Sequence, residues 1–279
     1  MFTDIKLYLK ILYFNIFFLL FFSFSLAQSE SNRLIISSTT STVDSGLASF
    51  LIEIFESEFN YSVHVLSHGT GQAIQIAKKG NADLLIVHNE KLEEEFMESG
   101  HGIKRYKLMY NNFFLVGSIK NPAKIETTDS IFEAMKKIHK SKSIFISRGD
   151  ISGTHLKEMY LWKESNLDMA SFGPWYKVVG QGMGATLNIA NNLGAYTVVD
   201  SSTWISFGNK DNLAILFEED DLLKNQYSII LVNPEKHPNV NQHWGNVFVK
   251  WILSDEGSHL INTFRVNNKQ LFIFNGEKI

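Results

Sequence analysis

Short strands alternate with amphipathic helices along most of the chain, and this alternation limits the fold more than any other feature of the sequence. Residues 62–66, 82–88 and 113–117 have the composition of strands, and apolar residues at helical spacing lie between them. Chains of this kind form α/β folds in which helices pack on mostly parallel sheets. We therefore expect an α/β fold with mostly parallel sheets.

The length of the chain and two very apolar segments predict a division into two lobes. A chain of 279 residues is long enough for two sheets of ordinary size. Residues 113–117 and 228–232 are the strands that we expect to cross between the lobes as a hinge. Lobe 1 would comprise residues 28–112 plus 228–279, and lobe 2 residues 113–227, with a crevice between them.

A turn rich in hydroxyl groups and glycine follows a predicted strand at three places. Because the first amides of a helix lack intrahelical partners and carry partial positive charge, each turn offers donors to an anion. Taken singly, each turn is equally well a helix cap or a plain turn. Three such turns at the carboxyl ends of strands are better explained by one crevice that collects anion-binding amides. The turns are Ser38-Thr39-Thr40-Ser41, His68-Gly69-Thr70-Gly71 and the stretch from Ser147 to His155.

The third turn also carries a full positive charge. Arg148 precedes Ser152-Gly153-Thr154, and its planar guanidinium can hold an oxyanion through two N–H groups. Gly153 would let an ion approach the backbone, and the hydroxyls of Ser152 and Thr154 add donors. The plainer alternative is that Ser152 only caps the helix and that Arg148 is a solvated surface group.

A second glycine-rich turn resembles a dinucleotide-binding fingerprint. Gly180-x-Gly182-x-x-Ala185 follows a predicted strand, and Asp200 ends the next one. We favour a ligand-facing glycine turn or a close helix–strand contact, because the pattern comes late in the chain. In addition, the first residues predict export, as described below, and an exported protein would have to find its cofactor outside the cytosol. The integrin-type tripeptide at Arg148 is short enough to be chance.

Charge and residue usage exclude several classes of function. The formal net charge is −3, so the chain offers no basic face to nucleic acid. There is no cysteine, and therefore no disulfide, thiolate metal site or lipidated N-terminal cysteine. His64 and His68 share a strand face but lie ~13 Å apart along it, too far to bind one metal. We expect no metal site.

The first 27 residues have the pattern of a signal peptide. Lys6 and Lys10 precede an apolar run over residues 11–24, and Ser25-Leu26-Ala27 offers small residues for cleavage. The alternative is an uncleaved membrane anchor, since the run approaches the length of a span. We expect cleavage near Ala27 and a periplasmic protein; no later stretch of the sequence is apolar enough to cross a membrane.

Four motifs resemble those of the periplasmic tungstate-binding proteins of ABC uptake systems, which have the type II solute-binding fold. The resemblance covers the whole mature chain; it departs from the family pattern at Ser38, where a third threonine is usual, and at His68, where a small or apolar residue is usual. The motifs are Thr39-Thr40-Ser41-Thr42 with Asp44-Ser45-Gly46-Leu47, Gly69-Thr70-Gly71-Gln72-Ala73, Arg148-Gly149-Asp150-x-Ser152-Gly153-Thr154-His155 and Gly180-Gln181-Gly182-Met183-Gly184-Ala185-Thr186-Leu187.

The resemblance implies a two-lobed binding protein that captures tungstate or molybdate and delivers it to a permease in the inner membrane. It implies a monomer with no enzymatic activity and no cofactor. The alternatives are a phosphate-type binding protein, an exported enzyme such as a phosphatase, and an adhesive protein. The ligand residues carried over by position are Thr39, Thr40, Ser41, Gly69, Thr70, Arg148, Ser152, Gly153 and Thr154.

The orientation of Asp150 distinguishes a bare dianion from phosphate. Phosphate keeps a proton near neutral pH, so a phosphate site should present a carboxylate to accept it, and Asp150 is the only acid inside the arginine motif. If Asp150 points at the ion, phosphate is favoured. The family pattern predicts that Asp150 turns away, toward nearby amides or Arg148.

Overall fold

The computed structural model describes residues 33–126, 130–218 and 221–278. The predicted leader, residues 1–27 with its cleavage point, lies outside the described residues. The elements below belong to one compact unit, Leu34–Ile279. None of the helices within the described ranges has the length and apolar character needed to span a bilayer.

The first part of the chain alternates strands and helices, as predicted. Its elements are β1 (Arg33–Thr39), α2 (Thr40–Asp44), α3 (Leu47–Phe59), β2 (Ser62–His68), α4 (Thr70–Lys78), β3 (Leu84–Val87) and α5 (Glu90–Glu98). Apolar residues at helical spacing, Val43, Leu47, Phe50 and Ile54, predict one helix over residues 43–54. This helix is divided in the structure, because Gly46 has a φ of +83°, a left-handed conformation that interrupts a helix. As a result α3 buries Leu47, Leu51 and Phe55, and not the face predicted for an unbroken helix.

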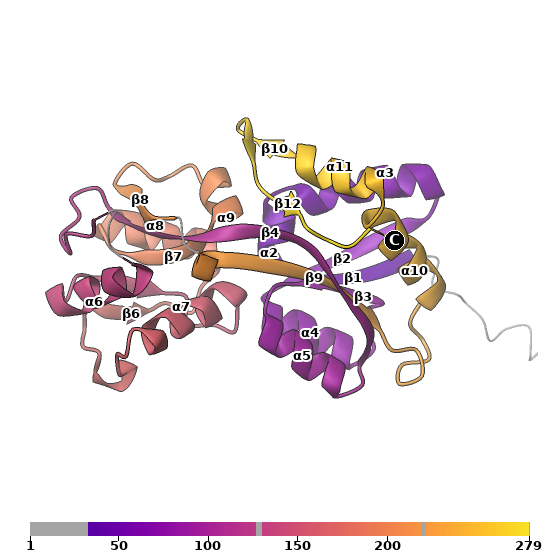
Figure 1. The fold of residues 1–279 in the computed structure, drawn as a ribbon, viewed down its shortest axis with the longest axis horizontal. Helices are drawn as coiled ribbons and strands as arrows, with labels where there is room; N and C mark the ends of the chain where they lie inside the picture. Colours follow the sequence, from indigo (N-terminus) through magenta and orange to yellow (C-terminus); the bar gives the residue numbers. More distant parts are fainter. Residues whose placement is uncertain (1–32, 127–129, 219–220, 279) are drawn as a thin grey trace, which may run out of the picture. The chain divides into compact units, whose positions relative to one another are not determined.

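Two long strands connect the two parts of this unit. The strand predicted at residues 113–117 is the end of β4 (Gly102–Ser118), and the strand predicted at 228–232 is most of β9 (Lys224–Val232). They pair along nearly all of β9 and lie side by side at the centre of Figure 1. The prediction of two crossing strands is therefore confirmed, with both strands longer than expected.

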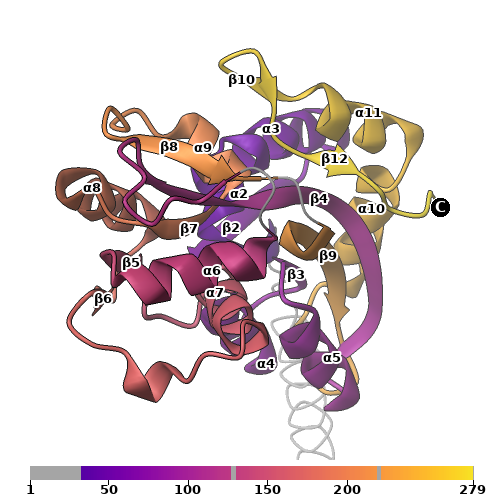
Figure 2. The ribbon, with the colours of Figure 1, turned by 60° about the vertical axis from the view of Figure 1, so that its left-hand side comes forward.

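The segment between β4 and β9 forms a second α/β group, and the last segment returns to the first group. In Figures 1 and 2, α11 lies beside β12, while α10 packs on α11 and β9. The elements are α6 (Ile131–Ser141), β5 (Phe145–Ser147), α7 (Gly153–Glu164), β6 (Tyr176–Val178), α8 (Met183–Leu193), β7 (Thr197–Asp200), α9 (Ser201–Ser206) and β8 (Leu213–Phe217), then α10 (Gln242–Ile252), α11 (Asp255–Thr263), β10 (Arg265–Val266), β11 (Lys269–Gln270) and β12 (Ile273–Phe274), with short 3₁₀ turns at Met169–Ser171 and Asp221–Leu223.

The α/β class is confirmed, while the strand directions follow the prediction only in part. β1 pairs with β3 in parallel, and β5 pairs with β6 in parallel. The main sheet has the order β12-β4-β9-β3-β1-β2, with β7 and β8 also on β4. β9 is antiparallel to β3 and β4, and β4 is antiparallel to β7, β8 and β12. A chain that leaves one group along β4 and returns along β9 must run in opposite directions on the two strands.

The buried apolar side chains in the described residues form four clusters. Two clusters draw on residues 34–109 and 227–272. The other two draw on residues 113–223. We propose that these two groups are the predicted lobes, residues 28–112 plus 228–279 and residues 113–227.

Asp83 connects β1 to the start of α10 through hydrogen bonds. Its side chain is buried, and its two carboxylate oxygens accept hydrogen bonds from the backbone amides of Ile35, at 2.7 Å, and Asn241, at 2.6 Å. Ile35 belongs to β1, and Asn241 caps the first turn of α10. One carboxylate therefore joins the start of the sheet to the start of a C-terminal helix.

We predict that Asp83→Asn lowers the free energy of unfolding by about 1.5 to 3 kcal/mol, because the amide turns an NH₂ group toward a backbone N–H that needs an acceptor. Urea denaturation measures the change. Asp211→Asn, at an exposed turn position, is the matched control and should stay within about 0.5 kcal/mol of the parent. Equal midpoints for the two variants would contradict the role given to Asp83.

Candidate functional site

The three hydroxyl- and glycine-rich turns meet around one pocket. All nine residues predicted as ligands line it, and five further residues join them. The pocket is small: its cavity volume is about 10 Å³, roughly the room that one water molecule requires. The lining consists of Thr39, Thr40, Ser41, Asp44, Gly69, Thr70, His88, Arg148, Ser152, Gly153, Thr154, Met183, Asp200 and Thr203.

Helix N-termini supply much of the pocket wall. α2, α4 and α7 begin at the three predicted turns, directly after or shortly after β1, β2 and β5. The N-cap residues of α2 and α4, Thr39 and Gly69, accept no hydrogen bond from a backbone amide of their helices; the Thr39 hydroxyl bonds to the hydroxyls of Ser41 and Thr42. Ser152 does cap α7, accepting from His155 N. The plain capping alternative therefore holds at Ser152, while the first turns of α2 and α4 keep amides that no side chain caps.

Two buried donors in the pocket have no partner in the described part of the protein. The hydroxyl oxygen of Thr70 and the Nε of Arg148 both lack a hydrogen bond. Thr70 is fully buried and Arg148 is 6% exposed, so Arg148 is not the solvated surface group of the plainer alternative. Because buried polar groups are almost always paired, two unpaired donors in one pocket indicate a missing acceptor.

Asp150 takes the orientation predicted for a site that binds a bare dianion. Its Oδ2 accepts from Arg148 Nη2 at 2.6 Å, and its Oδ1 accepts from the amide and the hydroxyl of Ser152 at 3.2 and 2.5 Å. Both oxygens are thus used within the turn. Asp150 orients the arginine fork and does not present a free acceptor to the pocket.

Two more carboxylates lie at the pocket, and the motif analysis did not assign them to it. Asp200 caps α9: its oxygens accept from Ser202 and from both the amide and the hydroxyl of Thr203. Asp44 is at the exposed rim. Partial burial raises the pKa of Asp44, the neighbouring Asp200 raises it further, and Arg148 opposes both. Asp44 was visible within the first motif, but only the fold brings it beside Asp200.

The glycine turn after β6 does not serve a dinucleotide in the way the fingerprint requires. The Asp200 carboxylate is engaged in capping α9 and is not free for a ribose hydroxyl. Open space surrounds the positions where side chains of Gly180 and Gly182 would begin, so close helix–strand packing does not require glycine there. Gly180 instead has a φ of +62°, and Met183, the first residue of α8, reaches the pocket.

The two residues that depart from the family motifs lie outside the pocket lining. The hydroxyl of Ser38 donates to the backbone oxygen of Ile86 on the neighbouring strand at 3.1 Å. His68 is the last residue of β2, directly before the pocket residue Gly69. Neither departure removes a side chain from the pocket.

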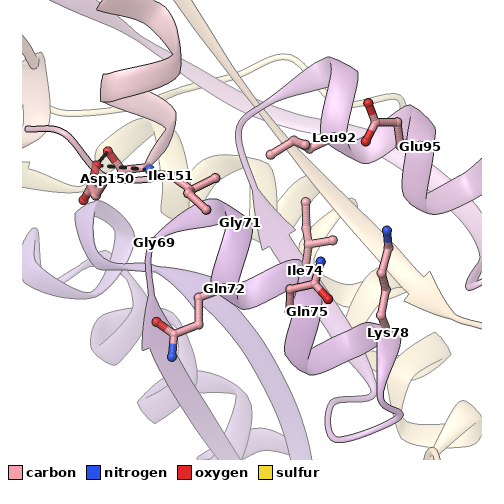
Figure 3. Close-up of a pocket in the computed structure, with 11 residues that line it drawn as sticks. Gly69, Gly71, Gln72, Ile74, Gln75, Lys78, Leu92, Glu95, Asp150 and Ile151 are labelled. Carbon is pink, nitrogen blue, oxygen red and sulfur yellow. Dashed lines mark hydrogen bonds between the residues drawn. The ribbon is translucent and has the colours of Figure 1, made fainter.

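A tight backbone contact joins two of the turns beside the pocket. Gly71 N donates to Ile151 O at 3.2 Å, and a Cβ atom on Gly71 would lie 2.6 Å from Ile151 Cγ2. Figure 3 shows Ile151 above the start of α4, next to a surface hollow bordered by Gln72, Lys78 and Glu95. Only a glycine at position 71 allows this approach.

His88 is a pocket residue that the sequence analysis did not assign to the site. It follows β3 directly, and it is 7% exposed. Its Nδ1 lies 2.8 Å from Asn225 Oδ1, and its ring lies against Tyr227, with 4.6 Å between the ring centroids. The available signal was its position at the carboxyl end of a predicted strand, the same place as the three turns.

A family model described as a PBP superfamily domain matches residues 26–256. The chain is 42% identical over 233 residues to the tungstate-binding protein TupA of Peptoclostridium acidaminophilum, covering 83% of this chain and 81% of that protein.

Two solved structures have the same architecture. The tungstate-binding protein TupA from Desulfovibrio alaskensis G20 matches with a TM-score of 0.78 and 36% identity, covering 88% of this chain and all of that one. The tungstate ABC transporter structure from Geobacter sulfurreducens matches with a TM-score of 0.76 and 40% identity, covering 85% of this chain and all of that one. From these matches, the chain that carries the unpaired donors of Thr70 and Arg148 belongs to the PBP superfamily and, within it, to the family of TupA tungstate-binding proteins.

Proposed function

We propose that this protein is the periplasmic tungstate-binding component of an ABC transporter. It captures the dianion in the pocket between the three turns and delivers it to a membrane permease. The observation that carries the proposal is the pair of buried donors without a partner, Thr70 Oγ1 and Arg148 Nε. A tetrahedral oxyanion supplies acceptors in several directions at once, which is what these two donors lack.

The proposed ligand set spans both groups of elements. Thr39, Thr40 and Thr70 come from the first group, while Arg148 and Thr154 come from the second. A single ion can therefore hold the two groups together. Because the cavity volume of the pocket is only about 10 Å³, an oxyanion larger than water can enter only if the turns first separate. The two crossing strands, β4 and β9, are the connections about which we expect this opening and closing.

Binding, and not catalysis, is the activity that this pocket supports. The carboxylates of Asp150 and Asp200 are held by hydrogen bonds within the protein, so neither is available as a general base in the observed arrangement. Proteins of this family are named as binding proteins, which favours capture and release over turnover. We infer no cofactor beyond the transported anion.

Export and partners follow from the same proposal. The predicted signal peptide, residues 1–27, would place the mature chain in the periplasm, where a binding protein meets its permease. We propose a monomer that presents the closed, loaded form to that permease.

Thr70→Val tests the unpartnered hydroxyl. The variant keeps the shape of the side chain and removes one donor, so we expect tungstate affinity to fall by about 1.5 to 3 kcal/mol while the ligand-free protein loses no stability. Thr197→Val is the matched control, because its buried hydroxyl donates to Ile146 O at 2.8 Å. That variant should lose stability and keep its affinity. Calorimetry and chemical denaturation together measure both effects, and the same pattern in the two variants would remove Thr70 from the site.

Arg148→Ala should weaken tungstate binding by about 2 to 5 kcal/mol, the usual cost of removing one partner of a buried charge pair. Arg148→Lys should also bind more weakly, because lysine keeps the charge and loses the planar fork. Arg265→Ala is the control: this arginine is exposed and bonds only to nearby backbone oxygens. Unchanged calorimetric affinity in Arg148→Ala would overturn the site assignment.

Thermal-shift titration with four anions tests which oxyanion is bound, since stabilisation grows as RT ln(1 + [L]/Kd). We expect tungstate to raise the melting temperature most and molybdate next, while sulfate and phosphate have little effect. A smaller anion would leave buried donors short of acceptors. Asp44→Asn should keep or increase the tungstate shift, because it removes negative charge at the rim. A dominant phosphate shift that disappears in Asp44→Asn would instead indicate a phosphate-type protein whose acceptor is Asp44.

A further inference from the structure

His88 lies in the pocket in a defined tautomeric state. Asn225 Nδ2 donates to Asn111 Oδ1 at 2.7 Å, so the oxygen of the Asn225 amide is the atom that faces His88. An amide oxygen only accepts hydrogen bonds, and the proton of the neutral imidazole must therefore be on Nδ1. Nε2 is left without a proton.

Among the described residues the Nε2 atom of His88 has no hydrogen-bond partner, since the hydrogen bond of the ring is the one between Nδ1 and Asn225. A Cβ atom on Gly153 would lie 2.3 Å from His88 Cε1, 2.5 Å from Nδ1 and 3.1 Å from Nε2, so the Cε1 corner of the ring packs on the first residue of α7. Gly153 and His88 both line the pocket. His88 therefore brings an acceptor nitrogen without a partner to the pocket.

Several charged groups act on the pKa of His88. Burial lowers the pKa of His88 to about 4; Asp200 and the bond to Asn225 oppose this, whereas Arg148 and Lys157 lower the pKa further. Asp44 lines the same pocket. Burial raises the pKa of the Tyr227 phenol, and the charge of Asp200 raises it further, so Tyr227 stays protonated. His88 is thus neutral at physiological pH in the ligand-free protein.

We propose that His88 is a further binding residue of the oxyanion site and that it takes up one proton from solvent on Nε2 when the dianion binds. The new N–H then donates to the bound ion, while Nδ1–H keeps its bond to Asn225. This inference rests on the proposed function.

The physical reason is the charge of the ligand. A dianion a few ångströms from the imidazole stabilises the protonated ring and offsets the repulsion from Arg148 and Lys157. Proton and anion then strengthen each other's binding by the same factor. Since the pKa of His88 is about 4 in the empty site and higher in the loaded site, affinity rises as the pH falls through the loaded-state pKa and levels off below the empty-state pKa. At pH values between these two pKa values, affinity rises about tenfold for each unit by which the pH falls.

The experiment measures the tungstate Kd by calorimetry from pH 8 to pH 6, at micromolar tungstate, in buffers of different ionisation enthalpy. The parent protein should bind more tightly as the pH falls and take up protons from the buffer. His88→Gln should lose both the pH dependence and the proton uptake. His64→Gln is the control: this histidine is exposed and lies outside the pocket lining, so the variant should keep both effects.

Nitrogen-15 NMR of histidine-labelled parent protein gives a readout that needs no variant. Tungstate should move one Nε2 resonance from the unprotonated to the protonated range, and that resonance should be missing in His88→Gln. Binding without proton uptake, or equal pH dependence in the parent and His88→Gln, would overturn the role of His88 while leaving the proposed function standing. Failure of the parent to bind tungstate at any pH would overturn the proposed function and this inference with it.

Discussion

The site depends on buried donors that the protein itself leaves unsatisfied. Leaving a buried N–H or O–H group without an acceptor costs about 1 to 3 kcal/mol, and Thr70 and Arg148 each carry one such group. A protein that only needed a stable turn would have capped these helices and paired the arginine fully. The unpaired donors instead define a place where an acceptor-rich ligand recovers the lost bonds. Asp150 keeps the arginine fixed for that ligand without competing for its remaining donor.

The two crossing strands connect this site to the motion that we expect on binding. Asn111 lies on β4, and Asn225 and Tyr227 lie on β9. Asn225 bonds to Asn111 and His88, while the Tyr227 hydroxyl lies 2.9 Å from Ser41 Oγ. The side chains that contact the pocket residues Ser41 and His88 therefore come from the same strands that join the two groups of elements. A change in the angle between the strands would alter the positions of Ser41 and His88 together.

The distribution of acids suits a site for a fully deprotonated anion. The carboxylate oxygens of Asp150 and Asp200 accept hydrogen bonds from nearby hydroxyls, amides and Arg148, so these acids position donors and offer no free acceptor to the anion. Asp44 remains at the rim, where partial burial and, after it, the charge of Asp200 raise its pKa. Selectivity then rests on how many donors an ion reaches, because every tetrahedral dianion carries the same charge.

The sequence by itself determined the α/β class, the two crossing strands and the turns that face one another, because strand and helix periodicity and turn composition are local properties. The fold decided what depends on distant segments. It split the predicted helix at Gly46, made β4 and β9 antiparallel, and brought Asp44 and His88 to the pocket. No spacing along the chain reveals that His88, after β3, packs on Gly153 of α7. Such contacts, and the protonation states that they impose, exist only once the chain has folded.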